Sequence, residues 1–370
     1  MILPRVLIPL GTISVAFAET HHLFSGFFSG STIAGIEFDD TASSLTLVKN
    51  ISSEASGSKW ITIDTRKENL YVATTGAFQS YKLTEDLDLA YQSSVNLSSS
   101  CNNANFVTAL SKAPYMVFGT PYGSGCPTLA ISTDSSGTLE ATVANASYLD
   151  SSGVHGTALS PKNDFLYSAD DMGNAVWVHS YDKATGVIRE VQYLAAASGS
   201  NPRHVVVHPN GKWVYVVYEE ANAIAAYERE TTTGKLEFHN ETYSLLPSGF
   251  TNSSSYWADE VLLSIPVDSN SPKYLLAATR SRTTGTSGYV SAFSLDPKSG
   301  GIKEQLFLQP TTGSGGSANA VSPAPFSESY FAITDSGENF LEVWRIEEKK
   351  ASVIAHLDLE NGPANVVWYD

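Results

Sequence analysis

A repeat in the middle of the chain most limits the folds that this sequence can adopt. Asn201–Glu230 has two alternating apolar runs around the turn His208–Gly211 and a third run after it, which predicts a β-meander. The stretch His155–Ile188 repeats this pattern, with Ser160-Pro161 lying 48 residues before the matching His208-Pro209. A period of this size, with short strands and glycine turns, is typical of a β-propeller blade.

The same unit recurs along most of the chain, and residues 19–370 give about 50 residues for each of seven blades. No long segment of helical periodicity interrupts the repeats, so we expect an all-β protein with little helix. The visible units are Trp60–Leu89, Ala104–Leu139, His155–Ile188, Arg203–Leu236, Glu260–Ile302 and Ala318–Val353.

The two ends of the chain supply the seventh blade. Gly30–Val48 contains only the later strands of a blade, whereas Asn361–Asp370 is similar to a first strand. Pairing of Asn365–Trp368 with the front strands would close the ring and remove the open sheet edges. The sequence therefore predicts a seven-bladed β-propeller closed by its N- and C-terminal strands, forming a single domain over residues 19–370.

The first 18 residues predict a signal peptide. They combine the basic Arg5, an apolar run over Val6–Phe17 and the small-residue pattern Ala16-Phe17-Ala18. The run is shorter than the roughly 20 apolar residues of a membrane span, and no later segment is as long. We therefore expect a secreted protein without a membrane span, in an extracellular or cell-wall location.

Other features agree with export. Cys101 and Cys126 are the only cysteines, and in an oxidising compartment they are expected to form a disulfide. Five Asn-x-Ser/Thr sequons predict N-linked glycans, although a serine-rich chain also produces such matches by chance. These sequons begin at Asn50, Asn96, Asn145, Asn240 and Asn252.

The acidic composition excludes some partners and makes the arginines informative. The formal net charge is −16, with 22 Lys and Arg against 38 Asp and Glu, so nucleic acid and anionic membranes are poor partners. An arginine that recurs at strand ends in such a protein is a candidate for holding an anion. The alternative is an ordinary surface or ion-paired arginine.

Two arginines and two other titratable residues lie at strand ends in successive repeats. His155 and Arg203 begin first strands, whereas Glu219 and Arg280 follow second strands, so all four should converge on one mouth of the central channel. Arginines bind carboxylates through two hydrogen bonds, and a carboxyl group and an imidazole exchange protons. A structural ion pair between Arg203 and Glu219 is the competing interpretation. Near neighbours that can replace these candidates are His204, Asp171, Glu220 and Arg282.

Several short motifs are spread over most of the chain: Val154–Gly156, Asn201–His204 with Tyr218-Glu219, Thr279-Arg280 with Gly288-Tyr289, Ser317–Pro323 and Asn365–Asp370. In these motifs the sequence resembles the fungal 3-carboxy-cis,cis-muconate cyclases, within the seven-bladed propeller lactonases that also include enzymes of the 6-phosphogluconolactonase type. The resemblance implies a site without metal or cofactor, in which His155 and Glu219 are catalytic and Arg203 and Arg280 bind a small carboxylate or lactone.

Three functions remain open at this stage. The first is cycloisomerisation, in which a substrate carboxylate adds to a conjugated diene and His155 or Glu219 supplies a proton. The second is hydrolysis of extracellular lactones by the same residues. The third is a binding or adhesion propeller without catalysis, because the fold does not fix the function. The leader and sequons depart from the intracellular cyclases, so the substrate stays open.

Overall fold

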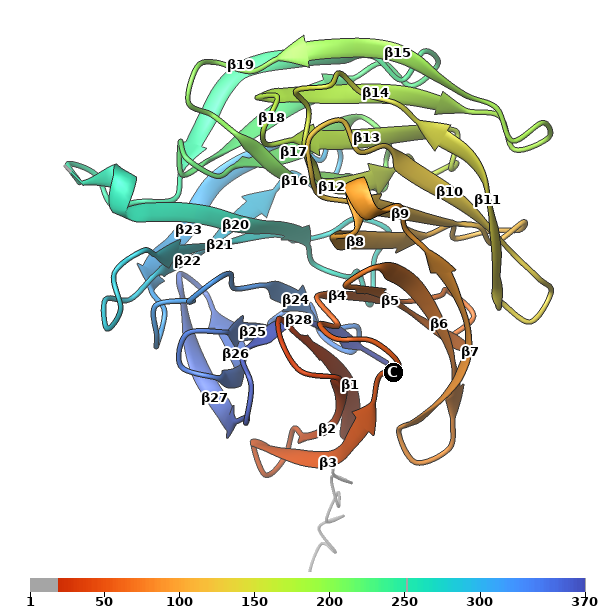
Figure 1. The fold of residues 1–370 in the computed structure, drawn as a ribbon. Helices are drawn as coiled ribbons and strands as arrows, with labels where there is room; N and C mark the ends of the chain where they lie inside the picture. Colours follow the sequence, from red (N-terminus) through yellow and green to blue (C-terminus); the bar gives the residue numbers. More distant parts are fainter. Residues whose placement is uncertain (1–18, 251, 370) are drawn as a thin grey trace, which may run out of the picture.

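The computed structural model describes residues 19–250 and 252–369, which form seven four-stranded antiparallel sheets arranged around a central channel (Figure 1). The first strand of each blade lines the channel, and the next three follow outward in sheet order. The predicted all-β propeller is confirmed. Residues 1–18, which carry the predicted signal peptide, lie outside the described residues.

The strands of the first four blades, each given from the channel outward, have these bounds. They are β28 (Pro363–Trp368), β1 (Thr20–Phe27), β2 (Thr32–Asp39) and β3 (Ser44–Ser52); β4 (Trp60–Ile63), β5 (Asn69–Thr74), β6 (Ala77–Thr84) and β7 (Asp88–Asn96); β8 (Ala104–Ala109), β9 (Val117–Pro121), β10 (Thr128–Thr133) and β11 (Leu139–Ala146); and β12 (Val154–Leu159), β13 (Phe165–Asp170), β14 (Ala175–Tyr181) and β15 (Ile188–Ala195).

The strands of the last three blades follow the same order. They are β16 (Pro202–Val207), β17 (Trp213–Tyr218), β18 (Ala223–Arg229) and β19 (Leu236–Ser244); β20 (Tyr256–Leu263), β21 (Tyr274–Ser281), β22 (Tyr289–Leu295) and β23 (Ile302–Pro310); and β24 (Val321–Pro323), β25 (Tyr330–Asp335), β26 (Phe340–Glu347) and β27 (Lys350–Asp358). Helix among the described residues amounts to the short 3-10 turns η1 (Ser99–Cys101) and η2 (Ser253–Ser255).

The ring closes through β28, but its direct partner differs from the expected one. β28 pairs antiparallel with β1, where Leu23 lies opposite Trp368 and Ser25 opposite Val366 (Figure 1). The comparison of repeats within the sequence started the front blade at Gly30, so it missed β1, which begins two residues after the predicted leader. The side chain of Asn365 then links β28 to the next blade through two hydrogen bonds to the backbone of Ile61, at 3.0 and 3.1 Å.

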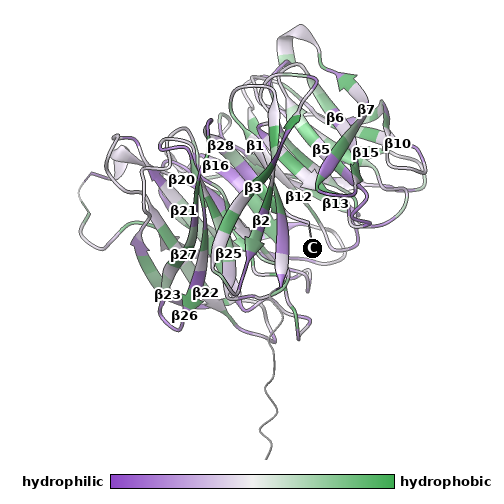
Figure 2. Ribbon diagram, turned by 90° about the horizontal axis from the view of Figure 1, so that it is seen from below, coloured by the Kyte–Doolittle hydropathy of each residue, from purple (hydrophilic) through white to green (hydrophobic). Residues whose placement is uncertain are grey.

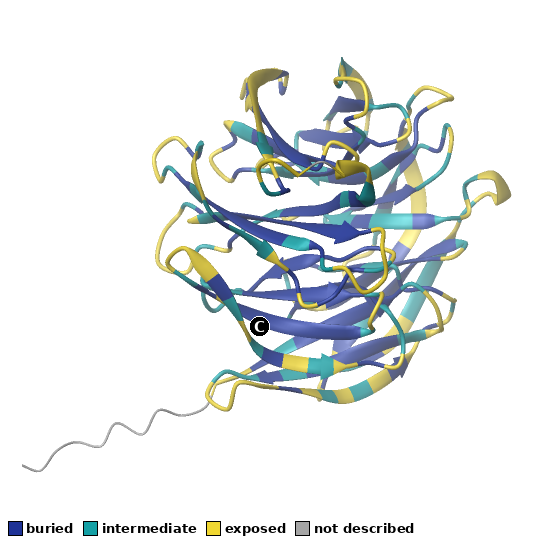
Figure 3. Ribbon diagram, turned by 90° about the vertical axis from the view of Figure 1, so that its left-hand side faces the viewer, coloured by how far each residue is buried: buried dark blue, intermediate teal, exposed yellow. Residues whose placement is uncertain are grey.

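The core consists of apolar clusters between neighbouring blades. Leu23 and Phe38 of the first blade, for example, pack against Leu341 and Val343 of the last, so this cluster also seals the closure. Hydrophobic residues concentrate in the strands, and the exposed residues lie in the loops and outer strands (Figures 2 and 3). This pattern explains why the strand repeat was visible in the sequence.

Surface features bear on the expected export. The predicted disulfide between Cys101 and Cys126 is confirmed and joins η1 to the β9–β10 loop. All five sequon asparagines are exposed; four of them lie on outermost strands, and Asn252 directly precedes η2. In the described part of the chain, no helix has the length and hydropathy needed to cross a membrane.

Candidate functional site

Four consecutive blades carry a β-bulge at the second residue of the innermost strand or close to it. The register of β12 against β13 skips His155, and the register of β16 against β17 skips Arg203. The same irregularity occurs at Asn105 in β8 and at Asp259 in β20. A bulge re-aims the extra side chain, so these four residues form one ring at the mouth where the innermost strands begin.

A second ring comes from the strand that pairs with each bulged strand. In the fifth blade it contributes Glu219, directly after the end of β17, and in the sixth it contributes Arg280 near the end of β21. The corresponding residues in the third and fourth blades are Tyr122 and Asp171. Side chains of the two rings interact directly, which brings the predicted residues His155, Arg203, Glu219 and Arg280 to one end of the channel.

The two arginines are bound by carboxylates of the protein itself. Arg280 donates through Nη2 to Glu219 Oε1 at 2.9 Å and through Nη1 to Asp259 Oδ1. Arg203 donates through Nη1 to the backbone oxygen of Asp259, and its Nε lies 3.3 Å from Glu219 Oε1. Two guanidinium groups are thus balanced by two carboxylates. The structure therefore contains the ion pair between Arg203 and Glu219 that the competing interpretation predicted.

Burial makes this charged cluster electrostatically unusual. Asp259 is fully buried, and Arg203, Arg280 and Glu219 are 6–8% exposed. Burial raises the pKa of Glu219 to about 7, although the positive charges of Arg203 and Arg280 oppose the shift. Burial also acts to lower the pKa of Arg203, but Asp259 and Glu219 outweigh it and raise that pKa. Glu219 can therefore hold or release a proton near neutral pH.

A hydrogen-bonded chain leads from His155 away from this cluster. His155 Nδ1 lies 3.0 Å from His204 Nε2, and His204 Nδ1 lies 2.9 Å from Glu260 Oε1. Burial, together with the positive charge of Arg203, holds the pKa of His155 well below its ordinary value. Burial lowers the pKa of His204 as well, although Glu260 opposes this. Both imidazoles are therefore neutral at neutral pH.

The secondary candidates divide into two groups. His204 and Asp171 belong to the site: Asp171 Oδ2 accepts a hydrogen bond of 2.6 Å from Tyr122, whose ring lies 5.2 Å from that of His155. Glu220 and Arg282 do not. Glu220 is exposed, and Arg282 is exposed where it stacks on Trp257 at 4.1 Å and donates to the backbone oxygen of Ser254. Both side chains lie outside the paired cluster.

The polar loop of residues 311–317, which follows β23, borders the site. Gly315 has a φ of +87°, and a Cβ there would lie 2.8 Å from Arg280 Cβ, so glycine is needed for both reasons. Directly beyond the loop, the backbone nitrogen of Asn319 donates to Asp259 Oδ2 at 3.0 Å. The loop thus holds the acidic partner of both arginines.

Three cavities among the described residues are lined by innermost strands, and the smallest is at the charged mouth. Its volume is about 30 Å³, enough for one or two water molecules, and Arg203 Nε and Asn319 Oδ1 in its wall lack hydrogen-bond partners among the described residues. The other two, of about 410 and 310 Å³, extend along the same channel and are mostly apolar. We place the candidate site at the smallest cavity, because the titratable side chains converge there. That cavity is lined by Phe28, Lys59, Trp60, Asn105, His155, Arg203, Ala318, Asn319 and Ala364.

Sequence reasoning missed the acidic site residues Asp259 and Glu260, as well as the uncharged Asn105 and Tyr122. The two acidic residues occupy the bulge and the following position in β20, which correspond to Arg203 and His204 in β16. The comparison of internal repeats started the repeat Glu260–Ile302 one residue too late, so it did not match Asp259-Glu260 with Arg203-His204. Aligning the starts of the first strands, instead of looking for recurring basic residues, would have found both acidic residues.

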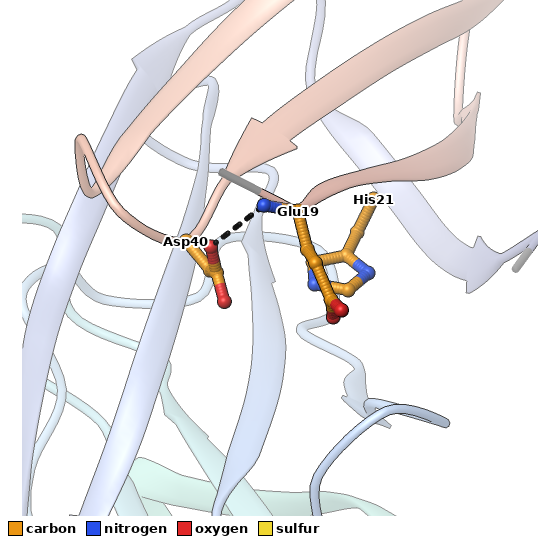
Figure 4. A group of neighbouring side chains, drawn as sticks. All are labelled: Glu19, His21 and Asp40. Atoms are coloured by element: carbon orange, nitrogen blue, oxygen red, sulfur yellow. Dashed lines mark hydrogen bonds between the residues drawn. The ribbon is translucent and has the colours of Figure 1, made fainter. Parts of the chain in front are cut away.

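A separate group of potential metal ligands lies near the start of β1 (Figure 4). Atoms of Glu19, His21 and Asp40 lie within 4.8 Å of one another, and the Glu19 nitrogen donates to Asp40 at 3.3 Å. β1 begins beside the end of β28, so this group is at the opposite mouth from His155. The buried His21 ring stacks on Phe326 with ring centroids 3.5 Å apart, and this packing accounts for its position.

Known proteins with the same architecture share its sequence pattern. A family model described as "Lactonase, 7-bladed beta-propeller" matches residues 22–321. The carboxy-cis,cis-muconate cyclase of Neurospora crassa is 31% identical over 373 residues, covering 95% of this chain and 99% of that protein. Muconate cycloisomerase 1 of Cutaneotrichosporon cutaneum is 28% identical over 389 residues, covering 96% and 100%. Among solved structures, a periplasmic gluconolactonase of Pseudomonas aeruginosa aligns with a TM-score of 0.80 at 18% identity, covering 95% of this chain and 99% of that chain. The expected resemblance is confirmed, and the chain belongs to the lactonase family of seven-bladed β-propellers.

Proposed function

We propose that this protein is a cofactor-independent cycloisomerase that acts on a carboxylate-bearing diene or the corresponding lactone. The observation that carries this proposal is the buried cluster of Arg203, Arg280 and Glu219, with a proton-exchanging carboxyl group between two guanidinium groups. The similarity to a carboxy-cis,cis-muconate cyclase along nearly the whole chain supports it. The substrate class follows from the arginines, which bind carboxylates through two hydrogen bonds.

Substrate binding must rearrange the charges of the cluster. In the described state, Glu219 and Asp259 balance both arginines. Protonation of Glu219 leaves one positive charge in excess, which a substrate carboxylate can neutralise. The cavity beside Arg203 holds only one or two waters, so the bulk of a substrate would lie above it, toward the loops of the mouth. Anion binding is therefore coupled to proton uptake at Glu219.

The reaction follows from this arrangement. An oxygen of one substrate carboxylate bonds to an alkene carbon and closes a five-membered lactone, while the adjacent carbon gains negative charge. Protonated Glu219 transfers its proton to that carbon, and the arginines stabilise the charge that develops on the neighbouring carboxylate. Binding both groups in one orientation removes much of the entropic barrier. Neither step calls for a redox centre or a Lewis acid.

Hydrolysis of a lactone is the second candidate, because the same groups can hold the acid of a lactone while His155 activates water. Purified protein should be screened against 3-carboxy-cis,cis-muconate and a panel of lactones, following loss of diene absorbance and release of acid. Loss of absorbance supports cycloisomerisation, whereas acid release from lactones alone supports hydrolysis. Saturable binding without turnover of any compound would overturn both and leave a binding propeller.

We also propose that the protein is exported and glycosylated. The predicted leader, the disulfide between Cys101 and Cys126, and the exposure of all five sequon asparagines support this location. Expression from the full-length sequence in a eukaryotic host should give protein in the medium whose mass falls on treatment with an N-glycosidase. Protein found only inside the cells, with no mass change on treatment, would contradict the proposal.

A further inference from the structure

The histidine chain behind the site has a defined direction. Glu260, His204 and His155 come from the innermost strands of three adjacent blades, β20, β16 and β12. As a carboxylate, Glu260 carries no proton, so its Oε1 accepts both from the backbone nitrogen of Val261 and from His204 Nδ1. His204 must therefore carry its proton on Nδ1.

The tautomer of His155 follows from that of His204. A neutral His204 with its proton on Nδ1 has a lone pair on Nε2, so His155 must donate to it from Nδ1 across the 3.0 Å contact. Asn105 Nδ2 donates to the His155 backbone oxygen at 3.0 Å and lies 3.3 Å from His155 Nδ1, so the contact of that nitrogen with His204 is the shorter of the two. The ring nitrogen that remains for a substrate is Nε2, without a proton.

Packing holds the middle of the chain in place. His204 is 1% exposed, and its ring meets the edges or faces of Trp60 and Phe106 with centroids 4.8 and 5.3 Å apart. Glu260 is 2% exposed, and its Oε2 has no hydrogen-bond partner among the described residues. A buried carboxylate with an unpaired oxygen is expensive to maintain for packing alone, which points to a function for its charge.

We propose that Glu260 and His204 are positioning residues that hold His155 with its proton on Nδ1, so that Nε2 begins each reaction as a proton acceptor. This role rests on the proposed function of the site. In lactone hydrolysis, the O–H bond of the attacking water breaks, its proton bonds to Nε2, and the oxygen bonds to the carbonyl carbon of the lactone; a substrate carboxylate attacks without giving up a proton. Glu219 supplies the proton that the product carbon or leaving oxygen needs. Glu260 stabilises the imidazolium through His204, as the third group of a triad does.

The direct test is the tautomer of His155 in the intact protein, measured by ¹⁵N NMR of histidine-labelled samples and assigned by the signals lost in His155→Gln. We expect a protonated Nδ1 and an unprotonated Nε2 at neutral pH. The reverse tautomer in the wild-type protein would overturn the proposal without any variant. This readout does not need turnover, so it stays decisive if the wild-type protein acts on none of the tested compounds and the proposed function fails.

Two variants and a control extend the test to activity. His204→Phe keeps an aromatic ring between Trp60 and Phe106 but removes both hydrogen bonds, so Asn105 becomes the donor to His155 Nδ1 and the tautomer reverses. We expect kcat to fall about 100-fold with KM changed less than about twofold. Glu260→Gln keeps an accepting oxygen and loses the charge, so kcat should fall about tenfold. This variant replaces His204→Phe in the test if His204→Phe does not fold.

The matched control is His179→Phe, since His179 is a buried histidine that packs on Tyr148 and Trp177 and takes no part in the hydrogen bonds from Glu260 to His155. It should leave the His155 tautomer and kcat unchanged, and it shows what a buried His→Phe change does to stability. Wild-type kcat and an unchanged His155 tautomer in folded His204→Phe would overturn the positioning role. If His204→Phe lowers the melting temperature and leaves kcat unchanged, the hydrogen bonds that join Glu260, His204 and His155 serve only the stability of the fold.

Discussion

Arg280 donates to Glu219 across 2.9 Å, so the residue expected to bind substrate is paired with the residue expected to transfer a proton. Asp259 completes the pairing on the other side of Arg280. Binding and proton transfer at this site are therefore coupled, because any anion that takes the place of Glu219 at the guanidinium changes the charge of the cluster.

Arg280→Lys tests the two-point contact of the guanidinium group. Lysine keeps the charge but cannot bind Glu219 and Asp259 in the same planar arrangement, so turnover should fall at least tenfold, or about 1.4 kcal/mol. The loss of a buried charged hydrogen bond should also lower the free energy of unfolding by about 2 kcal/mol. Steady-state kinetics and chemical denaturation measure both effects. Arg282→Lys, on the same Trp257 but exposed, should change neither; equal effects of the two variants would contradict a specific role for Arg280.

Glu219→Gln tests the pH dependence of stability. The folded-state pKa of Glu219, about 7, lies above its ordinary value of 4.5. Its contribution to stability is therefore complete below about pH 4.5 and is lost as the pH rises through 7. The wild-type free energy of unfolding should fall across this range by on the order of 3 kcal/mol more than that of Glu219→Gln. Parallel curves from urea denaturation between about pH 5 and pH 8 would show that Glu219 has an ordinary pKa.

The disulfide should stabilise the loop that carries Tyr122. Cys101 and Cys126 are 25 residues apart in sequence, and a crosslink of this length contributes about 3 kcal/mol in the loop-entropy model. The double variant Cys101→Ala/Cys126→Ala should lose this amount, as seen in chemical denaturation. Mass analysis of unreduced, denatured protein after alkylation should find no free thiol. Two alkylated cysteines would mean that the purified protein lacks the crosslink.

Removal of residues 361–370 should prevent folding. The deletion takes away β28, exposes the backbone of β1 and removes the hydrogen bonds of Asn365 to Ile61. We expect no soluble protein in the medium. A truncated protein that is secreted and melts at the parent temperature would contradict closure through β28.

The fold was predictable because each blade repeats the same apolar alternation, which burial between neighbouring blades requires. β1 was not predicted because its sequence THHLFSGF is separated from the leader by Glu19 alone, and the first strands were assigned to the later Gly30–Val48 region. The closure itself was found from the incomplete ends of the chain, although the partner of β28 was not.

The site was predictable only in part. Repeat alignment brought His155, Arg203, Glu219 and Arg280 together, but it could not show that Asp259 pairs with both arginines, since that depends on a bulge in β20. Glu220 and Arg282 stand next to site residues in sequence, yet neighbouring strand or loop residues point in different directions. The side-chain direction at a bulge is set by backbone geometry, which a single sequence does not contain.

The measurement that most directly tests the proposed site is turnover of 3-carboxy-cis,cis-muconate by the wild-type protein and by Glu219→Gln, followed as loss of diene absorbance. The substituted glutamine keeps the shape of the side chain but cannot donate a carboxyl proton. If the cluster is the active site, the wild-type protein consumes the diene, and the variant loses at least about 100-fold in kcat with KM changed less than about threefold. Equal turnover by the two proteins, or no turnover by the wild-type protein on this acid or on any lactone of the panel, would contradict the account.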